Sequence, residues 1–97
     1  MAGKEQQTQS LAQVFRILGD PTRLSILKVL VTGELNVTEL CRKLKLNQPT
    51  VSRHLSILKM SALVEARRNG KEIYYSVPGP KRRGVKTVLE RAVVLGR

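Results

Sequence analysis

The chain has 97 residues and carries 18 lysines and arginines against 7 aspartates and glutamates, a formal net charge of +11. Its length suits one small domain, and 41% hydrophobic with 26% charged residues is a globular rather than a disordered composition. A single cysteine excludes an intrachain disulfide and a multi-thiolate metal cage, and no apolar run approaches the roughly 18 residues that cross a bilayer. We therefore expect a cytoplasmic domain that uses no cofactor and no membrane.

The N-terminal segment, residues 1–8, lacks hydrophobic periodicity and is expected to form a flexible tail. It precedes a single domain over residues 9–97. A first helix is predicted over about 9–18, because its apolar residues recur at helical spacing. These residues are Leu11, Val14, Phe15 and Leu18.

Capping residues predict the second and third helices. Asp20 followed by Pro21 is typical of a helix start, since the carboxylate accepts from free backbone N–H groups and proline fixes φ. This second helix should run to about Val31. Thr38 is expected to cap a third helix that ends near Lys45.

The fourth predicted helix has Asn47 as its cap, Pro49 in its first turn, and an end near residue 61. Together with the third it forms a helix-turn-helix, a motif whose second helix fits the major groove of DNA. With the apolar stripe facing inward, Arg53 points outward and can pair bidentately with guanine. The residues predicted to contact DNA from this helix are Gln48, Pro49, Thr50, Ser52, Arg53 and Ser56.

From residue 64 onward, polar and apolar residues alternate with the period of a strand. Two such runs joined by Asn69-Gly70 predict a hairpin with a type I′ turn, in which Arg68 pairs with Lys71 and Arg67 with Glu72. A hairpin beside a helix-turn-helix makes a winged helix, and cations at its tip are expected to contact phosphates or the minor groove. The wing residues predicted to contact DNA are Arg67, Arg68, Asn69, Gly70 and Lys71.

A fifth helix is predicted from Lys81 or Arg82, after the sheet ends at residues 78–80. Its apolar stripe and that of the first helix exceed what one small core covers, so we expect a two-fold interface; packing within one protomer is the alternative. The predicted interface residues are Leu11, Val14, Phe15, Leu18, Val85, Val88, Leu89, Ala92 and Val93. The expected fold is α+β, mainly α with a small β-hairpin: a dimeric winged helix-turn-helix with five helices and a two-stranded wing.

The positive charge is concentrated late in the chain, where residues 53–97 hold 11 of the 18 basic residues and 3 of the 7 acidic ones. Such an excess favours a polyanionic partner. Three aromatic side chains are too few for a base-stacking surface, which favours double-stranded DNA. The basic run 81–83 either neutralises flanking DNA or only solvates a helix start. A nucleoid-type protein with little sequence preference and a small RNA-binding module stay open as alternatives.

Two side chains with functional chemistry occur once each in the chain. His54 is expected to pack or to contact a phosphate rather than to bind a metal. Cys41 lies on the apolar stripe of the third helix and is expected to be structural, with a redox role as the alternative. Because no nucleophile–base pair is visible, we predict that the protein is not an enzyme.

Four segments together resemble the ArsR/SmtB family: LGDPTRLSIL at 18–27, ELC at 39–41, NQPTVSRHL at 47–55 and IYYSV at 73–77. The resemblance implies a prokaryotic, dimeric winged-helix repressor that leaves its operator when an inducer binds. It also implies DNA-reading positions and a dimer interface built from the first and last helices. By resemblance, the reading positions are Gln48, Thr50, Ser52 and Arg53.

The chain departs from this family at the inducer sites. The Cys-Val-Cys run of arsenic-, cadmium- and lead-sensing members is replaced by Asn36-Val37-Thr38, and the segment 81–97 lacks the Asp and His ligands of zinc and nickel sensors. Cys41 matches the first thiol of sulfur-sensing relatives, whose second cysteine is missing here. The resemblance thus predicts a repressor whose small-molecule inducer is unknown and is not a metal, with a redox- or sulfur-responsive repressor using Cys41 as the alternative.

Overall fold

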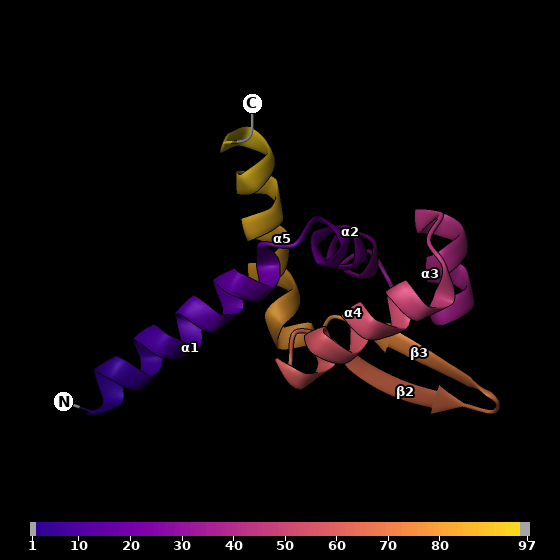
Figure 1. The fold of residues 1–97 in the computed structure, drawn as a ribbon, viewed down its shortest axis with the longest axis horizontal. Coiled ribbons are helices and arrows are strands. Elements are labelled where there is room, and N and C mark those ends of the chain that lie inside the picture. The colour runs from indigo at the N-terminus through magenta and orange to yellow at the C-terminus, as the bar shows by residue number, and fades with distance from the viewer. Residues whose placement is uncertain (1, 96–97) are drawn as a thin grey trace.

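The computed structural model describes residues 2–95, with side chains for residues 8, 9 and 11–91 (Figure 1). Helices and strands alternate in the order expected of a winged helix, with a hairpin between the fourth and fifth helices. Their bounds are α1 (Ala2–Leu18), α2 (Pro21–Leu30), β1 (Leu35–Asn36), α3 (Val37–Leu44), α4 (Gln48–Met60), β2 (Glu65–Asn69), β3 (Glu72–Ser76) and α5 (Gly79–Leu95). Figure 1 shows the β2–β3 hairpin projecting from one side of the helices and α1 from the other.

The core lies among α2, α3 and α4, where the apolar stripes of these short helices meet. Its most deeply buried side chains are at most 1% exposed, so each gives the full hydrophobic gain of roughly 1.5–3 kcal/mol. Those side chains are Ile26, Leu27, Leu30, Leu40, Val51, Leu55, Leu58 and Val77. By contrast, the described side chains of α1 and α5 contribute one buried residue each, Ile17 and Leu89.

Side-chain caps fix where the three core helices begin. The Asp20 carboxylate accepts from the backbone N–H groups of Thr22 and Arg23, at 2.8 and 3.1 Å. The sequence suggested Thr38 as the cap of α3, but the cap is Asn36. Asn36 Oδ1 accepts from the backbone N–H of Glu39, and the Glu39 carboxylate accepts from the backbone N–H of Asn36. This reciprocal capping box satisfies two free donors, which one hydroxyl could not do.

Two helix boundaries also differ from the prediction. The segment 1–8 was expected to be a tail, yet α1 begins at Ala2, because Ala, Lys, Glu and Gln favour a helix even without an apolar stripe. The last helix begins at Gly79, two residues early. Pro80 lies in its first turn, where the missing N–H would be unpaired in any residue.

The sheet has three strands in the order β1-β3-β2, one more than predicted. In the additional strand, β1, Leu35 pairs with Tyr75 and Asn36 with Tyr74. A strand of two residues is too short to show a period of two in the sequence. The hairpin turn is Gly70-Lys71 rather than Asn69-Gly70, because Asn69 pairs with Glu72.

This shift of the turn changes the pairs that were predicted. Arg68 pairs with Ile73 and Arg67 with Tyr74. Of the two turn residues only Gly70 has a positive φ, +66°, the pattern of a type II′ turn. The pairing moved by two residues, and an even shift leaves each side chain on its predicted face.

Ala62 closes α4 in a conformation that suits glycine. Its φ is +59°, and the hydrogen bonds from Ala62 N–H to Lys59 O and from Leu63 N–H to Leu58 O, both 3.0 Å, form a Schellman motif. Burial of Leu58 and Leu63 supplies the apolar contact that accompanies this motif. An alanine there is strained by its Cβ.

We therefore expect Ala62→Gly to raise the free energy of unfolding by about 1 kcal/mol, because it removes that strain. Ala12→Gly, an exposed position within α1, is the matched control and should lower the free energy by roughly 1 kcal/mol. Urea denaturation measures both changes. Destabilisation by both substitutions would contradict the left-handed assignment of Ala62.

Candidate nucleic-acid interface

Helix α4 presents a polar face to solvent because its apolar stripe is fixed in the core. Val51, Leu55 and Leu58 are buried against α2 and α3. On the other side Arg53 is exposed, and its side chain makes no hydrogen bond or ion pair with another described residue. Gln48, Pro49 and Ser56 are exposed as well, while Thr50 and Ser52 are half-buried. The residues predicted to read DNA therefore lie along one accessible face and its margin.

His54 is turned into the protein, with 6% of its surface exposed. Its Nδ1 lies 3.3 Å from Arg23 Nη1 and 3.9 Å from Asp20 Oδ1. These distances place it in the packing role rather than at the surface. Asp20 and Arg23 were not predicted as its partners, because 31 residues separate Arg23 from His54 and no local pattern links them.

The cations of the wing are not equivalent. Arg67 Nη2 donates to Glu34 Oε1 at 2.6 Å, and the guanidinium lies 5.4 Å from the centre of the Tyr74 ring. The Glu34 carboxylate raises the pKa of Arg67, with a smaller contribution from Tyr74. Glu34 precedes β1, so the strand that the sequence did not reveal is what brings this carboxylate to the wing.

Arg68 and Lys71 are the cations of the wing without such a partner. Both are exposed, as are Asn69 and Gly70 between them, and neither cation bonds another described residue. Their charge is therefore available to phosphates, whereas that of Arg67 is shared with Glu34. Arg68 and Arg67 lie on opposite faces of the hairpin because they are adjacent in β2.

The basic run at the start of α5 divides in the same way. Lys81 Nζ donates to Ala62 O at 2.6 Å, and Arg82 Nη2 donates to Val77 O at 3.4 Å. These two side chains tie α5 to the ends of α4 and β3. Arg83 and Lys86 are exposed, and the charged group of neither bonds another described residue. Only part of this run is thus available to flanking DNA.

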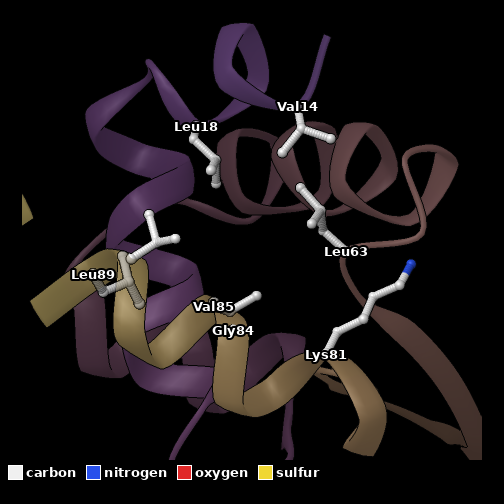
Figure 2. Close-up of a pocket in the computed structure, with 8 residues that line it drawn as sticks. Val14, Leu18, Leu63, Lys81, Gly84, Val85 and Leu89 are labelled. Carbon is white, nitrogen blue, oxygen red and sulfur yellow. The ribbon is translucent and has the colours of Figure 1, made fainter. Parts of the chain in front are cut away.

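The predicted interface residues with described side chains are exposed or line a pocket, and Val88 does both. Leu11, Phe15 and Val88 are 57%, 60% and 42% exposed, which is unusual for large apolar side chains. Val14, Leu18, Val85, Val88 and Leu89 line a pocket of about 310 Å³ between α1 and α5. Figure 2 shows Val14 and Leu18 facing Val85 and Leu89 across it. Ala92 and Val93 lie outside the described side chains.

Cys41 is half-buried and packs against the core with its thiol free. Within residues 2–95, no three histidines, cysteines or acidic residues are grouped so as to hold a metal ion. No helix in that range has both the length and the apolar composition needed to cross a membrane.

A family model for bacterial regulatory proteins, arsR family, matches residues 20–66. This range begins at the cap of α2 and ends in β2, so it contains the helix-turn-helix described above. A transcriptional regulator of the HTH type from Methanocaldococcus jannaschii is 42% identical over 84 residues, which cover 84% of this chain and 94% of that protein. The chain belongs to the arsR family.

Other members of the family resemble the chain over most of its length. A biofilm growth-associated repressor from Xylella fastidiosa is 38% identical over 79% of this chain and 68% of its own length. The homodimeric winged helix-turn-helix DNA-binding domain of a Mycobacterium bovis protein has a TM-score of 0.84 and 34% identity, with 92% of this chain and 83% of that chain covered. The winged-helix prediction and the family resemblance are therefore confirmed.

The ion pair between Arg67 and Glu34 yields a prediction for the wing of this arsR-family protein. Glu34→Gln should release Arg67 to a phosphate and increase the slope of log affinity against log salt concentration by about 0.9. Titrations of a DNA duplex between 50 and 200 mM salt measure this slope.

Glu72→Gln is the matched control, because Glu72 is an exposed carboxylate at the same hairpin that holds no arginine. It makes the same change in charge and should raise the affinity without the full increase in slope. Equal slopes for the two variants would contradict the proposed release of Arg67.

Proposed function

We propose that this protein is a sequence-specific transcriptional repressor that binds operator DNA as a homodimer. The observation that carries the proposal is the exposed, unpaired Arg53 on a helix whose opposite face is fixed in the core. Membership of the arsR family and the repressor named among its relatives support the same function. Acting on a promoter, such a protein would work in the cytoplasm, at the nucleoid.

Helix α4 would enter the major groove, with Arg53 able to pair bidentately with a guanine edge. Gln48 at the start of the helix and the half-buried Thr50 and Ser52 would contact adenine, phosphates or nearby base edges. The tip of the wing, with Arg68 and Lys71, would lie along the adjacent backbone or minor groove. In this arrangement α4 gives the sequence preference and the wing adds affinity that depends on salt.

A dimer follows from the apolar surface that one protomer leaves uncovered. Leu11, Phe15 and Val88 are exposed on α1 and α5, and a second copy would bury them by two-fold symmetry. The homodimeric Mycobacterium bovis domain supports this arrangement. A symmetric dimer would hold two α4 helices about 34 Å apart, one turn of DNA, and so would require an operator with two similar half-sites.

Repression would result from occupation of the promoter, and its relief would require an inducer. The residues that hold metals in other members are replaced here, so we propose an inducer other than a metal ion. The lone Cys41 thiol is half-buried, and a redox response through it is the alternative. If Cys41 is the redox sensor, Cys41→Ser would abolish operator release by oxidants or sulfur species. With another inducer, the substitution would leave that release unchanged.

The contribution of α4 can be separated from that of the wing. Arg53→Ala should weaken binding to a selected operator by about tenfold and binding to random duplex much less, because it removes a base contact worth ~1–3 kcal/mol. Arg68→Ala should weaken both to a similar extent and lower the salt slope by about 0.9.

Arg91→Ala controls for charge in this comparison, since Arg91 is exposed in the C-terminal part of α5. Figure 1 shows that this end of α5 points away from the wing. This substitution should change neither the ratio of operator affinity to random-duplex affinity nor the salt slope appreciably. Fluorescence anisotropy with both duplexes gives the affinities. Equal losses for Arg53→Ala on operator and random DNA would favour the nucleoid-type alternative.

The dimer interface gives a further prediction. Phe15→Glu places a charge at an apolar contact and should raise the dimer dissociation constant by more than about tenfold. Met60→Glu is the control, because Met60 is 88% exposed on α4, outside the proposed interface. Sedimentation velocity compares the two variants. An unchanged dimer in Phe15→Glu would remove Phe15 from the interface.

A further inference from the structure

One guanidinium group in α2 contacts both α1 and α4. Arg23 lies in α2, and its Nε donates to the backbone oxygen of Ile17 in the last turn of α1 at 2.7 Å. Its Nη1 lies 3.3 Å from His54 Nδ1 in α4. The backbone N–H of Arg23 is in turn bound by the cap residue Asp20. A single side chain thus connects the end of α1 to α4.

The chemistry of the two partners fixes the direction of this contact. Arginine can only donate hydrogen bonds, so His54 Nδ1 must be the acceptor. In a hydrogen bond donated by Arg23 Nη1, the ring therefore carries its N–H on Nε2. A leucine at position 54 would fill similar space but accept nothing, and a lysine at position 23 would have one nitrogen where the arginine uses two.

This contact is suited to orient α4 because the rest of its packing has little directionality. Val51, Leu55 and Leu58 hold the helix by apolar burial, which tolerates small rotations and shifts. A hydrogen bond requires defined distance and angle. His54 follows Arg53 directly, so the bond fixes the helix backbone beside the side chain proposed to read guanine, where displacement of about 0.5 Å weakens bidentate pairing.

We propose that Arg23 and His54 are positioning residues that set the orientation of α4 relative to α1, and with it the sequence preference of the dimer. This inference rests on the proposed function, because it assigns the pair a role in selecting the operator. Since α1 lies in the proposed interface, the Arg23 bridge also relates the α4 helix of each protomer to the two-fold axis. Neither residue contacts DNA itself.

The test uses the full chain and a duplex selected from a random library by the wild-type protein. The quantity measured is the specificity ratio, the affinity for that duplex divided by the affinity for a scrambled one. His54→Leu should lower this ratio about tenfold, because α4 loses the contact that orients it and Arg53 is displaced from bidentate pairing with guanine. His54→Asn, whose Oδ1 can accept from Arg23, should keep the ratio within about twofold of the wild type.

Arg23→Lys completes a double-mutant cycle. It should lower the ratio as His54→Leu does, and the two substitutions together should lower it no further, because they break the same bond. Melting temperature and dimer dissociation constant are measured for each variant, and ratios are compared at a temperature where all are folded dimers. A purely structural role would alter stability without changing the ratio of the folded protein.

Each outcome decides the matter. An unchanged ratio in His54→Leu, equal losses in His54→Leu and His54→Asn, or additive losses in the double variant would each overturn the proposal. If His54→Leu does not fold, an unchanged ratio in Arg23→Lys overturns it. A wild-type protein that selects no preferred duplex would instead refute the proposed function, a result visible before any variant is made.

Discussion

Burial of the apolar stripe of α4 is the constraint on which the proposed DNA-contacting surface depends. Once Val51, Leu55 and Leu58 are fixed against α2 and α3, the helix has one remaining face, and Arg53 is on it. The residues proposed to contact DNA are exposed without needing a specific contact of their own within the protein. A substitution that loosens the stripe would therefore affect recognition even where it touches no base.

The net charge of +11 overstates the charge that is available to DNA. Arg67 is paired with Glu34, Lys81 and Arg82 donate to backbone oxygens, and Arg23 is used inside the fold. Cations already held by the protein keep their charge, but they must break a contact before they bind a phosphate. The salt dependence of binding should thus reflect the free cations rather than the composition.

Much of the fold could be predicted from local patterns, and the departures have local causes. The apolar stripes and the caps Asp20 and Asn47 predicted all five helices, with different starts for α1 and α5 and a different cap for α3, and alternation predicted the hairpin. Strand β1 has two residues and exists through pairing with β3, so it has no pattern of its own. The contacts of His54 could not be predicted either, because they join residues far apart in sequence whose proximity depends on the packed helices.

The apolar residues of the core and those exposed on α1 and α5 have different roles in the fold. The core residues are covered within one chain, whereas Phe15 and Val88 are exposed on the two helices that frame the pocket. Recognition of a symmetric operator requires that dimer geometry be transmitted to α4, and apolar contacts transmit orientation poorly because they lack direction. Arg23 supplies a directional contact at both ends of that path, to Ile17 and to His54. Its two hydrogen bonds therefore connect the proposed dimer surface with the helix proposed to read DNA.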